Sequence, residues 1–429
     1  NGKGTSIDGG GIRISFASPT VRRNQIVKNF ACNIAINFGS PLIQSNVIRD
    51  NDNTSGGCST GGGGILIGGA GSAQILDNTI SNNTASRGGG ISLWAAGTPL
   101  IRGNIITGNT GGDGGGISMV NFSDAKIIQN VIAGNTASRG GGIYWLVPGG
   151  GQHGPSIISN SIIDNNASQQ GSGIYADGFD GFTPVRNNLI IGKTGQPAIY
   201  CGNLNDSNPP ILEFNNVFTA EAAGYSGSCS DVTGTNGNIS AAPLFTNSAA
   251  GDFRLLAGSP GINAGNNAVP DLPTLGLDSV RRILPTGGAV DMGAYEFAAP
   301  TSSTISPSTL TFPDQAAGTV SAPLEVTLTN TGSEILVVRS ITLNGEFSQT
   351  NTCQTASGVG AGQSCTISIR FAPSAGGPRS GQLTVSGNWG AGNTVTLSGN
   401  GVADLSLSTT PIPFSDQRVG SLSAATTVT

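Results

Sequence analysis

The sequence predicts an all-β protein in which a solenoid of short repeated coils precedes a β-sandwich and the first strands of a second sandwich. The isoleucine that follows a glycine triplet recurs at Ile91, Ile117 and Ile143, so the period is 26 residues (117 − 91 and 143 − 117). The last third of the chain changes to alternating β patterning. Within it, residues 310–327 align without gaps to residues 412–429, an offset of 102. A fixed short period is typical of a solenoid, and alternating apolar residues are typical of strands.

Each repeat of the solenoid contains short strand-like runs without helical spacing. Residues 75–83 read ILDNTISNN, and the next two repeats read IRGNIITGN and IIQNVIAGN. A glycine-rich step then leads into a second apolar run, GGGISLW, GGGISMV or GGGIYWL. Such strands cannot bury a face alone, but stacked coils can. The period and the glycine and asparagine corners together resemble the right-handed parallel β-helix, the fold of pectate lyases and of many bacterial surface proteins.

Asparagines recur at one corner of successive coils. They are Asn24, Asn46, Asn78, Asn104, Asn130, Asn160 and Asn188. Asparagine tolerates the left-handed backbone that a sharp corner needs, and its amide can bond the amide of the next coil. We therefore interpret these residues as an inward ladder with rungs about 4.8 Å apart, which is a structural device rather than a ligand site.

We expect the β-helix to span residues 1–240, followed by a closing segment at residues 241–297. Insertions such as residues 147–155 and 177–183 mark where loops project. The closing segment contains DFRLLAGSPGINAG and AVDMGAYEF, and it resembles the end of bacterial β-helix proteins of the choice-of-anchor Q type. We expect its apolar side chains to cover the open last coil, and its acidic residues Asp291 and Glu296 to belong to this cap rather than to a catalytic pair. The apolar residues in question are Phe245, Phe253, Leu255 and Tyr295.

The C-terminal part is predicted to begin with a linker at residues 298–303 (AAPTSS). Residues 304–402 have the strand lengths and turns of an immunoglobulin-like sandwich. The phrases TLTNTG, FAP and LSGNG within it resemble choice-of-anchor D and ASH-type modules of bacterial surface proteins. Residues 403–429 correspond to an incomplete second module. Two strands are not stable alone, so either a longer chain continues with such modules or these strands pair with a neighbouring subunit. The residues that we assign to this assembly contact are Pro411, Phe414, Val419 and Leu422.

The composition argues against several classes of protein. Glycine accounts for 68 of 429 residues, but the hydrophobic fraction of 37% is periodic, so the glycines belong to corners rather than to a disordered chain. The net charge is −5 and lysine occurs only at positions 3, 28, 126 and 193, so there is no basic patch for nucleic acid. No apolar run approaches the length of a membrane span. The chain begins without methionine or a signal peptide, which we interpret as a mature or cut form.

The six cysteines fall into three local pairs. The expected disulfides are Cys32–Cys58, Cys201–Cys229 and Cys353–Cys365. None of these pairs has CxxC spacing and the chain has one histidine, so a zinc site is not expected. Paired cysteines favour an oxidising compartment, and we expect an extracellular or bacterial cell-surface location.

The acidic residues do not have the spacing of a glycoside hydrolase. Asp50 and Asp164 occupy one corner position but lie four rungs apart, about 19 Å at the usual strand spacing, whereas hydrolysis requires carboxylates about 5–10 Å apart. Asp50 and Asp52, in the sequence RDNDN, are the nearest approach to a calcium loop. Oxygen-rich calcium sites use six or more ligands, so ordinary turn composition is the favoured interpretation and no cofactor is expected, Ca²⁺ being the one candidate.

Arg87, Asp113 and Arg139 each precede a repeat isoleucine by four residues and are therefore expected to stack on successive rungs. We interpret them as an ion ladder; the alternative is a stripe that binds the carboxylates of acidic sugars. Trp94 and Trp145 are interpreted as related positions two coils apart, where they stack sugars, cover a loop or meet a partner subunit. The single histidine, His153, is expected to be a solvated loop residue without an acidic partner.

These observations favour a non-enzymatic extracellular protein: a rigid β-helix rod joined to immunoglobulin-like modules, with a structural, adhesive or filament-forming role. Its expected partners are copies of itself or neighbouring surface proteins. The alternative is a polysaccharide lyase or carbohydrate-binding module that acts on acidic polysaccharide along the face that carries Arg87.

Overall fold

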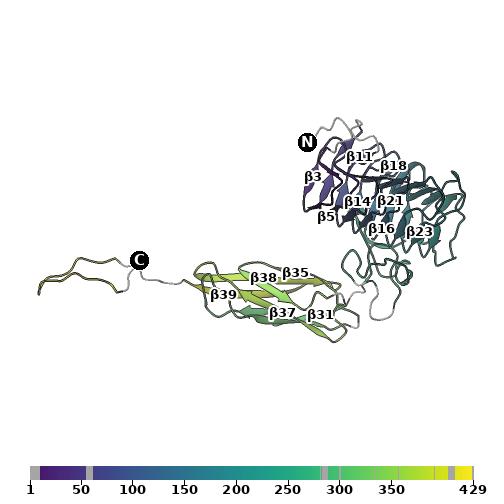
Figure 1. The fold of residues 1–429 in the computed structure, drawn as a ribbon. Helices are drawn as coiled ribbons and strands as arrows, with labels where there is room; N and C mark the ends of the chain where they lie inside the picture. Colours follow the sequence, from purple (N-terminus) through teal and green to yellow (C-terminus); the bar gives the residue numbers. More distant parts are fainter. Residues whose placement is uncertain are drawn as a thin grey trace. The chain divides into compact units, whose positions relative to one another are not determined.

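The structure is a computed structural model that describes residues 10–54, 61–280, 282, 288–298, 301–332, 334–355, 357–390, 392–403 and 411–427. The chain divides into two compact units, residues 1–297 and 298–429. The first unit is a parallel solenoid and the second contains antiparallel sheets (Figure 1). This confirms the predicted all-β fold class.

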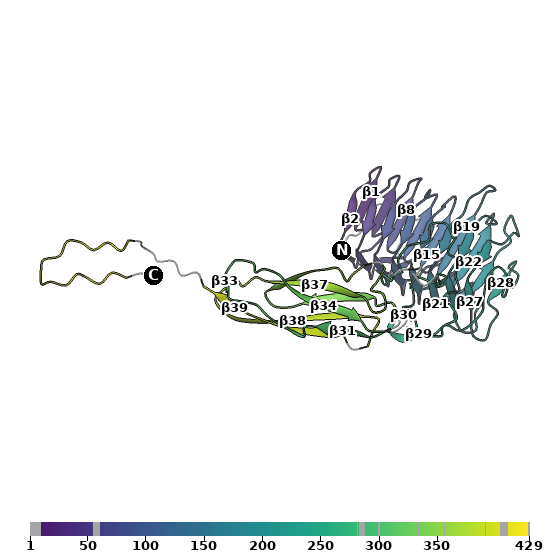
Figure 2. The same ribbon diagram turned by 90° about the horizontal axis from the view of Figure 1, so that it is seen from below.

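The solenoid consists of three parallel sheets whose strands stack coil upon coil (Figure 2). Sheet 1 contains, in spatial order, β1 (Ile12–Ser15), β4 (Ile34–Asn37), β8 (Ile65–Gly68), β12 (Ile91–Trp94), β15 (Ile117–Val120), β19 (Ile143–Val147), β22 (Ile174–Gly178), β25 (Ile199–Cys201) and β28 (Tyr225–Gly227). Sheet 2 contains β2 (Thr20–Arg22), β5 (Leu42–Gln44), β9 (Gln74–Leu76), β13 (Leu100–Arg102), β16 (Lys126–Ile128), β20 (Ser156–Ile158), β23 (Pro184–Arg186) and β26 (Ile211–Glu213). Sheet 3 contains β3 (Gln25–Val27), β6 (Val47–Arg49), β10 (Thr79–Ser81), β14 (Ile105–Thr107), β17 (Val131–Ala133), β21 (Ser161–Gln170), β24 (Leu189–Gly192) and β27 (Asn216–Phe218). Shorter pairings join β7 (Asp52–Asn53) to β11 (Thr84–Ala85) and β18 (Thr136–Arg139) to β21.

The register follows the sequence period. Ile91 pairs with Ile117, and Ile117 pairs with Ile143. The inward isoleucines of all three sheets form one continuous core, because alternate residues of a strand point to opposite faces. A Cβ at Gly116, in the glycine triplet that precedes β15, would lie 2.6 Å from the carbonyl oxygen of Gly142 in the next coil. The triplet therefore permits a close approach of successive backbones.

Two asparagine ladders run along the solenoid, and one of them was predicted. The predicted ladder is continuous from Asn24 to Asn188 and extends to Asn215 and Asn238. A second ladder, which sequence reasoning missed, lies at the other end of sheet 3. Its members are Asn29, Asn51, Asn83, Asn109, Asn135 and Asn165. The signal was present, because each of these asparagines follows a member of the first ladder by five residues.

The closing segment does not cover the open last coil as predicted. It contains β29 (Phe245–Asn247), a 3₁₀ turn (Ser248–Ala250) and β30 (Asp252–Leu255), and it packs along the outer side of the solenoid. Phe253 belongs to one buried cluster with the outward side chains of Val131 and Ile163, and Leu255 belongs to another with that of Leu189. Apolar residues at outward strand positions need a cover, because exposed apolar area is costly. At the last coil, Tyr225, Cys229 and Val232 pack against the core instead.

The second unit contains a sandwich of two sheets. One sheet has the order β31 (Ser303–Ser306), β34 (Leu324–Asn330), β37 (Ser364–Phe371), β36 (Phe347–Asn351). The other has β32 (Thr309–Thr311), β39 (Asn393–Val402), β38 (Gly377–Gly387), β35 (Val338–Leu343), and β33 (Gln315–Ala316) also pairs with β39. Their inner faces share one core that includes Val326, Ile367 and Val395.

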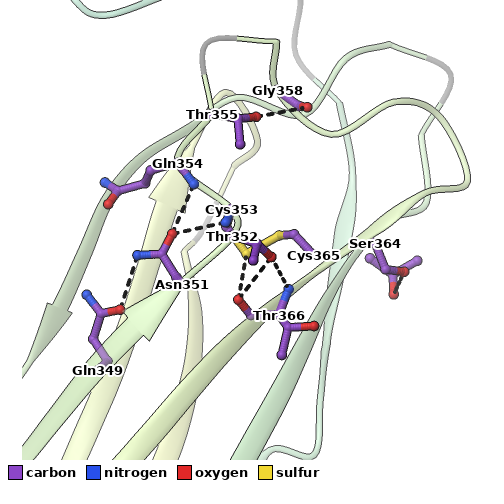
Figure 3. The surroundings of a disulfide bond; sticks show 11 residues. Gln349, Asn351, Thr352, Cys353, Gln354, Thr355, Gly358, Ser364, Cys365 and Thr366 are labelled. Atoms are coloured by element: carbon purple, nitrogen blue, oxygen red, sulfur yellow. Dashed lines mark hydrogen bonds between the residues drawn. A yellow bond between two sulfur atoms is a disulfide. The ribbon is translucent and has the colours of Figure 1, made fainter.

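Two of the three predicted disulfides lie within the described residues. Cys353 and Cys365 are bonded with a Cα–Cα distance of 5.1 Å, beside a pair of hydrogen bonds between Thr352 and Thr366 (Figure 3). Cys201 and Cys229 are bonded across the last coils of the solenoid. Cys32 is also disulfide-bonded, and its predicted partner, Cys58, lies outside the described residues.

Candidate functional site

The predicted charge column is present in the residues that lead into the strands of sheet 1. The Asp113 carboxylate receives a two-pronged hydrogen bond from Arg139, with Nε to Oδ1 at 2.8 Å and Nη2 to Oδ2 at 2.9 Å. Arg87 Nε lies 3.8 Å from Asp113 Oδ2 on the other side. The side chain of Asp113 is 13% exposed, whereas those of Arg87 and Arg139 are 36% and 35% exposed. The prediction that these residues stack on successive rungs is confirmed, and the two arginines present positive charge to solvent.

A stack of tyrosine rings continues this column along the axis. Tyr144, Tyr175 and Tyr200 are paired in register, and their ring centroids lie 5.1 and 4.9 Å apart. The Arg139 guanidinium lies 5.1 Å from the Tyr144 centroid and 5.3 Å from the Tyr175 centroid, within the range of cation–π contact. The column and the stack together form a charged and aromatic face, which we call the Arg–Tyr face.

Burial and charge set the protonation of this face. The hydrogen bond from Arg139 to Asp113 raises the pKa of the guanidinium, so the side chain stays cationic. Burial, assisted by the nearby Asp177, raises the pKa of Tyr175 to about 12. Burial also raises the pKa of Tyr144. Both phenols are therefore neutral hydrogen-bonding groups near neutral pH, and neither is a ready proton acceptor.

The two tryptophans do not share a position, which corrects the sequence interpretation. Trp94 pairs with Val120 and points outward, 39% exposed. Trp145 pairs with Met119 and points into the core, 1% exposed, where its Nε1–H donates to Asp180 Oδ2 at 2.9 Å. The two residues are the fourth and third of their strands, and an offset of one residue reverses the face of a strand. Trp145 is therefore part of the core and cannot stack against a sugar on the surface.

His153 has an acidic partner, contrary to the prediction. Its Nδ1 lies 2.9 Å from Asp124 Oδ2, and Asp124 Oδ1 accepts the backbone N–H of Gly154 at 2.8 Å. The ring also meets Phe122 edge-on, with centroids 5.0 Å apart. The contact joins an inserted loop to the corner of the preceding coil. It could not be predicted from the repeat, because the inserted residues have no counterpart one period away. Its geometry is that of a loop anchor.

The acidic residues considered for calcium or hydrolysis are engaged locally. Asp50 pairs with Arg49. Asp52 Oδ1 accepts the backbone N–H and the hydroxyl of Thr54 at 2.9 and 2.7 Å. Asp164 pairs with Lys193 at 3.1 Å. Within the described ranges, which omit residues 55–60, no three acidic, histidine or cysteine side chains gather as metal ligands.

The closing segment contains a buried ionic cluster. Arg282, Asp291 and Glu296 are 0%, 1% and 4% exposed. Arg282 Nη1 lies 3.3 Å from Glu296 Oε2 and donates to the carbonyl of Asp291 at 3.2 Å, while Asp291 accepts the backbone N–H groups of Asn263 and Phe297. Burial raises the pKa of Glu296 to about 9 and that of Asp291 to about 6. These groups bond to the segment's own backbone, which agrees with a structural role.

Three loops that follow sheet 1 enclose a hollow of about 400 Å³. They follow β19, β22 and β25 in successive coils, and their lining residues include Phe179, Phe182 and Asp206. Two of these insertions were noted in the sequence as projecting loops, but the hollow was not predicted. The available signal was that consecutive coils carry insertions at the same corner.

Residues 411–427 carry the predicted assembly residues in an extended form with one bend (Figure 2). Pro411 is exposed, and Phe414, Val419 and Leu422 are 63%, 103% and 98% exposed. The bend at residues 418–421 corresponds to a bend at residues 316–319 of the sandwich, 102 residues earlier. Ser421 donates to the carbonyl of Arg418 through its backbone N–H at 2.9 Å and its hydroxyl at 2.7 Å, and Thr319 donates likewise to Ala316 at 3.1 and 2.6 Å.

Residues 10–190 match the family model described as "Right handed beta helix region". No curated protein matches the chain. Among solved structures, it is similar to the "ASH / PapD-like domain of human CEP192 (PapD-like domain 7)", with 17% identity, 25% of this chain and 89% of that chain covered, and a TM-score of 0.19. It is also similar to the "Secreted serine protease VesC from Vibrio cholerae", with 13% identity, 24% of this chain and 22% of that chain covered, and a TM-score of 0.18.

No helix in the described residues is both long and apolar enough to cross a membrane. The disulfides are compatible with an extracellular protein.

Proposed function

We propose that this protein is a non-enzymatic structural or adhesive component of the bacterial cell surface, in which the β-helix is a rigid rod joined to sandwich modules. The observation that carries the proposal is that the conspicuous polar side chains pair with one another along the solenoid axis. Asparagine bonds to asparagine, arginine to aspartate and tyrosine stacks on tyrosine in successive coils. Such ladders stiffen a solenoid, because each coil is tied to both neighbours by groups that are already desolvated.

The positions of the carboxylates support a role without hydrolysis. Asp50 follows β6 and Asp164 lies within β21, and these two strands are separated by four strand pairings in sheet 3. At about 4.8 Å per pairing, the two carboxylates lie about 19 Å apart. Hydrolysis of a glycosidic bond requires two carboxylates about 5–10 Å apart. Each carboxylate also has its own cationic partner.

The segment of residues 411–427 supports self-association as the finer proposal. Leu310 and Phe312, which correspond to Ile412 and Phe414, are 8% and 3% exposed in the sandwich. Ile412 and Phe414 are 38% and 63% exposed. The segment thus has the bend and the apolar positions of the first strands of a sandwich while its apolar side chains face solvent, and burying them against further strands would stabilise it.

Negative-stain electron microscopy of the purified protein tests this proposal. Filaments with a fixed axial repeat are expected, and a chain that ends at Val402 should give only single particles. Phe414→Ser should also reduce assembly, whereas Ser415→Ala in the same segment should not. Single particles from the full chain, or normal filaments from the chain that ends at Val402, would refute assembly through this segment.

The second candidate function is binding or cleavage of acidic polysaccharide, and the Arg–Tyr face favours it. Arg87 and Arg139 expose about a third of their side chains, and Arg139 lies beside the rings of Tyr144 and Tyr175. This arrangement suits carboxylated sugars. Pectin, alginate and hyaluronan should be added with and without calcium, and unsaturated products followed by absorbance. Product formation that Arg139→Ala abolishes would establish the lyase, and binding without product would establish a binding module.

A further inference from the structure

The hollow beside sheet 1 is built by three consecutive coils. Residues 148–155 follow β19, residues 179–183 follow β22, and residues 202–210 follow β25. These loops are at least as long as the corners of the earlier coils, such as residues 95–99 between β12 and β13, and two of them are longer. Loops at the same corner of successive coils lie side by side, since the strands before them pair in register.

Buried aspartates hold the loops in place. Asp177 Oδ1 accepts the backbone N–H groups of Gly178 and Leu204, both at 2.9 Å, and so ties the end of β22, where the second loop begins, to the third loop. Asp180, 2% exposed, accepts the Trp145 indole N–H at 2.9 Å, and the backbone N–H of Thr183 donates to the Asp180 carbonyl at 2.8 Å. The second loop is therefore anchored to the core below it, and the hollow is preformed.

The lining combines aromatic rings with one polar pair. Phe182 is 58% exposed, and Phe179 is half-buried against the core. Asp206 Oδ1 accepts the backbone and side-chain N–H groups of Asn208 at 3.0 and 2.6 Å, which lowers the pKa of the carboxyl and keeps it ionised. Asp206 Oδ2 and Asn208 Oδ1 receive no hydrogen bond within the described residues. These two oxygens can accept hydrogen bonds from a ligand, and the side-chain N–H of Asn208 that does not bond to Asp206 can donate one.

We propose that this hollow binds a neutral oligosaccharide, with a sugar ring against Phe182 and adjacent hydroxyls on Asp206 and Asn208. A sugar ring presents an apolar face that packs on an aromatic ring. Its neighbouring hydroxyls donate and accept, as a carboxylate beside an amide requires. Gly151 and Gly181 carry no side chain into the space. Asp206 is the single charged residue among the described residues of the lining, so an acidic sugar would meet repulsion there.

This site differs from the Arg–Tyr face in both chemistry and position. The Arg–Tyr face is positive and lies on the outer side of sheet 1 and of the residues that lead into it, whereas the hollow lies in the loops that follow the strands of that sheet. The inference deepens the proposed adhesive role and rests on it for its biological meaning. Sugar binding at the hollow does not depend on self-association. Electron microscopy can therefore refute self-association while calorimetry supports sugar binding, and the reverse.

The test is isothermal titration calorimetry of the full chain with hexasaccharides of glucose, mannose, xylose and N-acetylglucosamine, and with hexagalacturonate as the acidic counterpart. At least one neutral hexasaccharide should bind, and hexagalacturonate should not compete. Phe182→Ala should weaken binding about tenfold, since one stacking contact contributes on the order of 1.4 kcal/mol. Phe16→Ala is the matched control, because Phe16 is exposed, stacks on Phe38 and follows β1, several coils away from the hollow.

A second variant protects the test against loss of folding. Asp206→Asn retains an oxygen that accepts the Asn208 N–H groups, so the loop is preserved while one acceptor becomes a donor. Several-fold weaker binding is expected with an unchanged thermal transition. Absence of binding by all four neutral hexasaccharides at millimolar concentration would overturn the proposal, as would equal binding by Phe182→Ala and the unmodified chain. Binding of hexagalacturonate alone would overturn it in favour of the Arg–Tyr face.

Discussion

Asn130 lies one coil beyond Asn104, and its side-chain oxygen accepts both the backbone N–H and the side-chain amide of Asn104, at 2.9 and 3.0 Å. The same two bonds recur from Asn78 to Asn104, and Asn104 also donates to the carbonyl of Ile75 at 2.8 Å. Each rung therefore satisfies buried backbone groups of two coils. Because the acceptor of each asparagine–asparagine bond is in the next coil, the ladder couples coils that here lie 26 residues apart in the sequence.

Replacing one rung should destabilise the solenoid. Asn104→Ala removes the acceptor for two N–H groups of Asn78 and the donor to Ile75, and buried unsatisfied groups cost about 1–3 kcal/mol each. We expect a loss of about 3 kcal/mol in the free energy of unfolding, measured by urea titration with circular dichroism. Asn24→Ala, at the exposed start of the same ladder, should cost less than about 1 kcal/mol. Equal losses for the two variants would contradict a cooperative ladder.

The glycine triplet should tolerate no side chain. A Cβ at Gly116 would lie 2.6 Å from the carbonyl oxygen of Gly142 and 2.8 Å from Ile132 Cγ2. Gly116→Ala should therefore destabilise by about 2–3 kcal/mol through overpacking. Gly134 has a left-handed φ of +62°, and a Cβ there would meet no atom within 4 Å, so Gly134→Ala should cost about 1–2 kcal/mol from backbone strain alone. Thermal unfolding of both variants measures the difference, and a milder effect at Gly116 would refute close approach as the reason for the triplet.

The lateral packing of the closing segment should depend on its buried aromatic residue. Phe253 is 7% exposed and packs on Val131 and Ile163, so Phe253→Ala should cost about 3–5 kcal/mol. The variant should also be cut faster by proteases within residues 241–280. Leu256, in the same stretch, is 46% exposed, and Leu256→Ala should leave the digestion pattern unchanged. If Phe253→Ala were as resistant to proteolysis as the unmodified chain, the lateral packing would be wrong.

Asp180 should make the protein less stable as the pH rises. Burial raises the pKa of Asp180 to about 7 from its ordinary 3.8, so between these values the folded state holds a proton that the unfolded state has lost. The contribution of Asp180 to the free energy of unfolding is therefore fully present below about pH 4. It is lost as the pH rises to about 7, and the loss is at most about 4 kcal/mol.

Asp180→Asn keeps an acceptor for the Trp145 indole but has no carboxyl to ionise. It should be more stable than the unmodified chain at pH 8 and similar to it at pH 4, as measured by urea titration at both values. Asp164→Asn, which replaces a carboxylate whose side chain is 61% exposed, is the control for the loss of one surface carboxylate. A constant difference between Asp180→Asn and the unmodified chain across this range would exclude Asp180 as the titrating group.

Contacts between neighbouring coils were predictable because the period itself specifies which residues meet. Residues one period apart become partners in a parallel pairing, which is why the ladder from Asn24, the column of Arg87, Asp113 and Arg139, and the disulfide between Cys201 and Cys229 followed from counting. The same rule exposes the error at Trp145. Counted from its glycine triplet, Trp145 is the third residue of its run and so falls on the inward face.

By itself, therefore, the sequence determined the all-β solenoid, its inward face, its ladder and the change to a sandwich, because local patterning and a fixed repeat encode them. Only the tertiary structure decided where the closing segment lies, since the bond from Ala294 N–H to Ser161 Oγ joins residues 133 positions apart with no repeat between them. It also decided the His153–Asp124 contact and the hollow at Phe182. Inserted loops leave the period, and their contacts depend on packing in three dimensions rather than on position in the repeat.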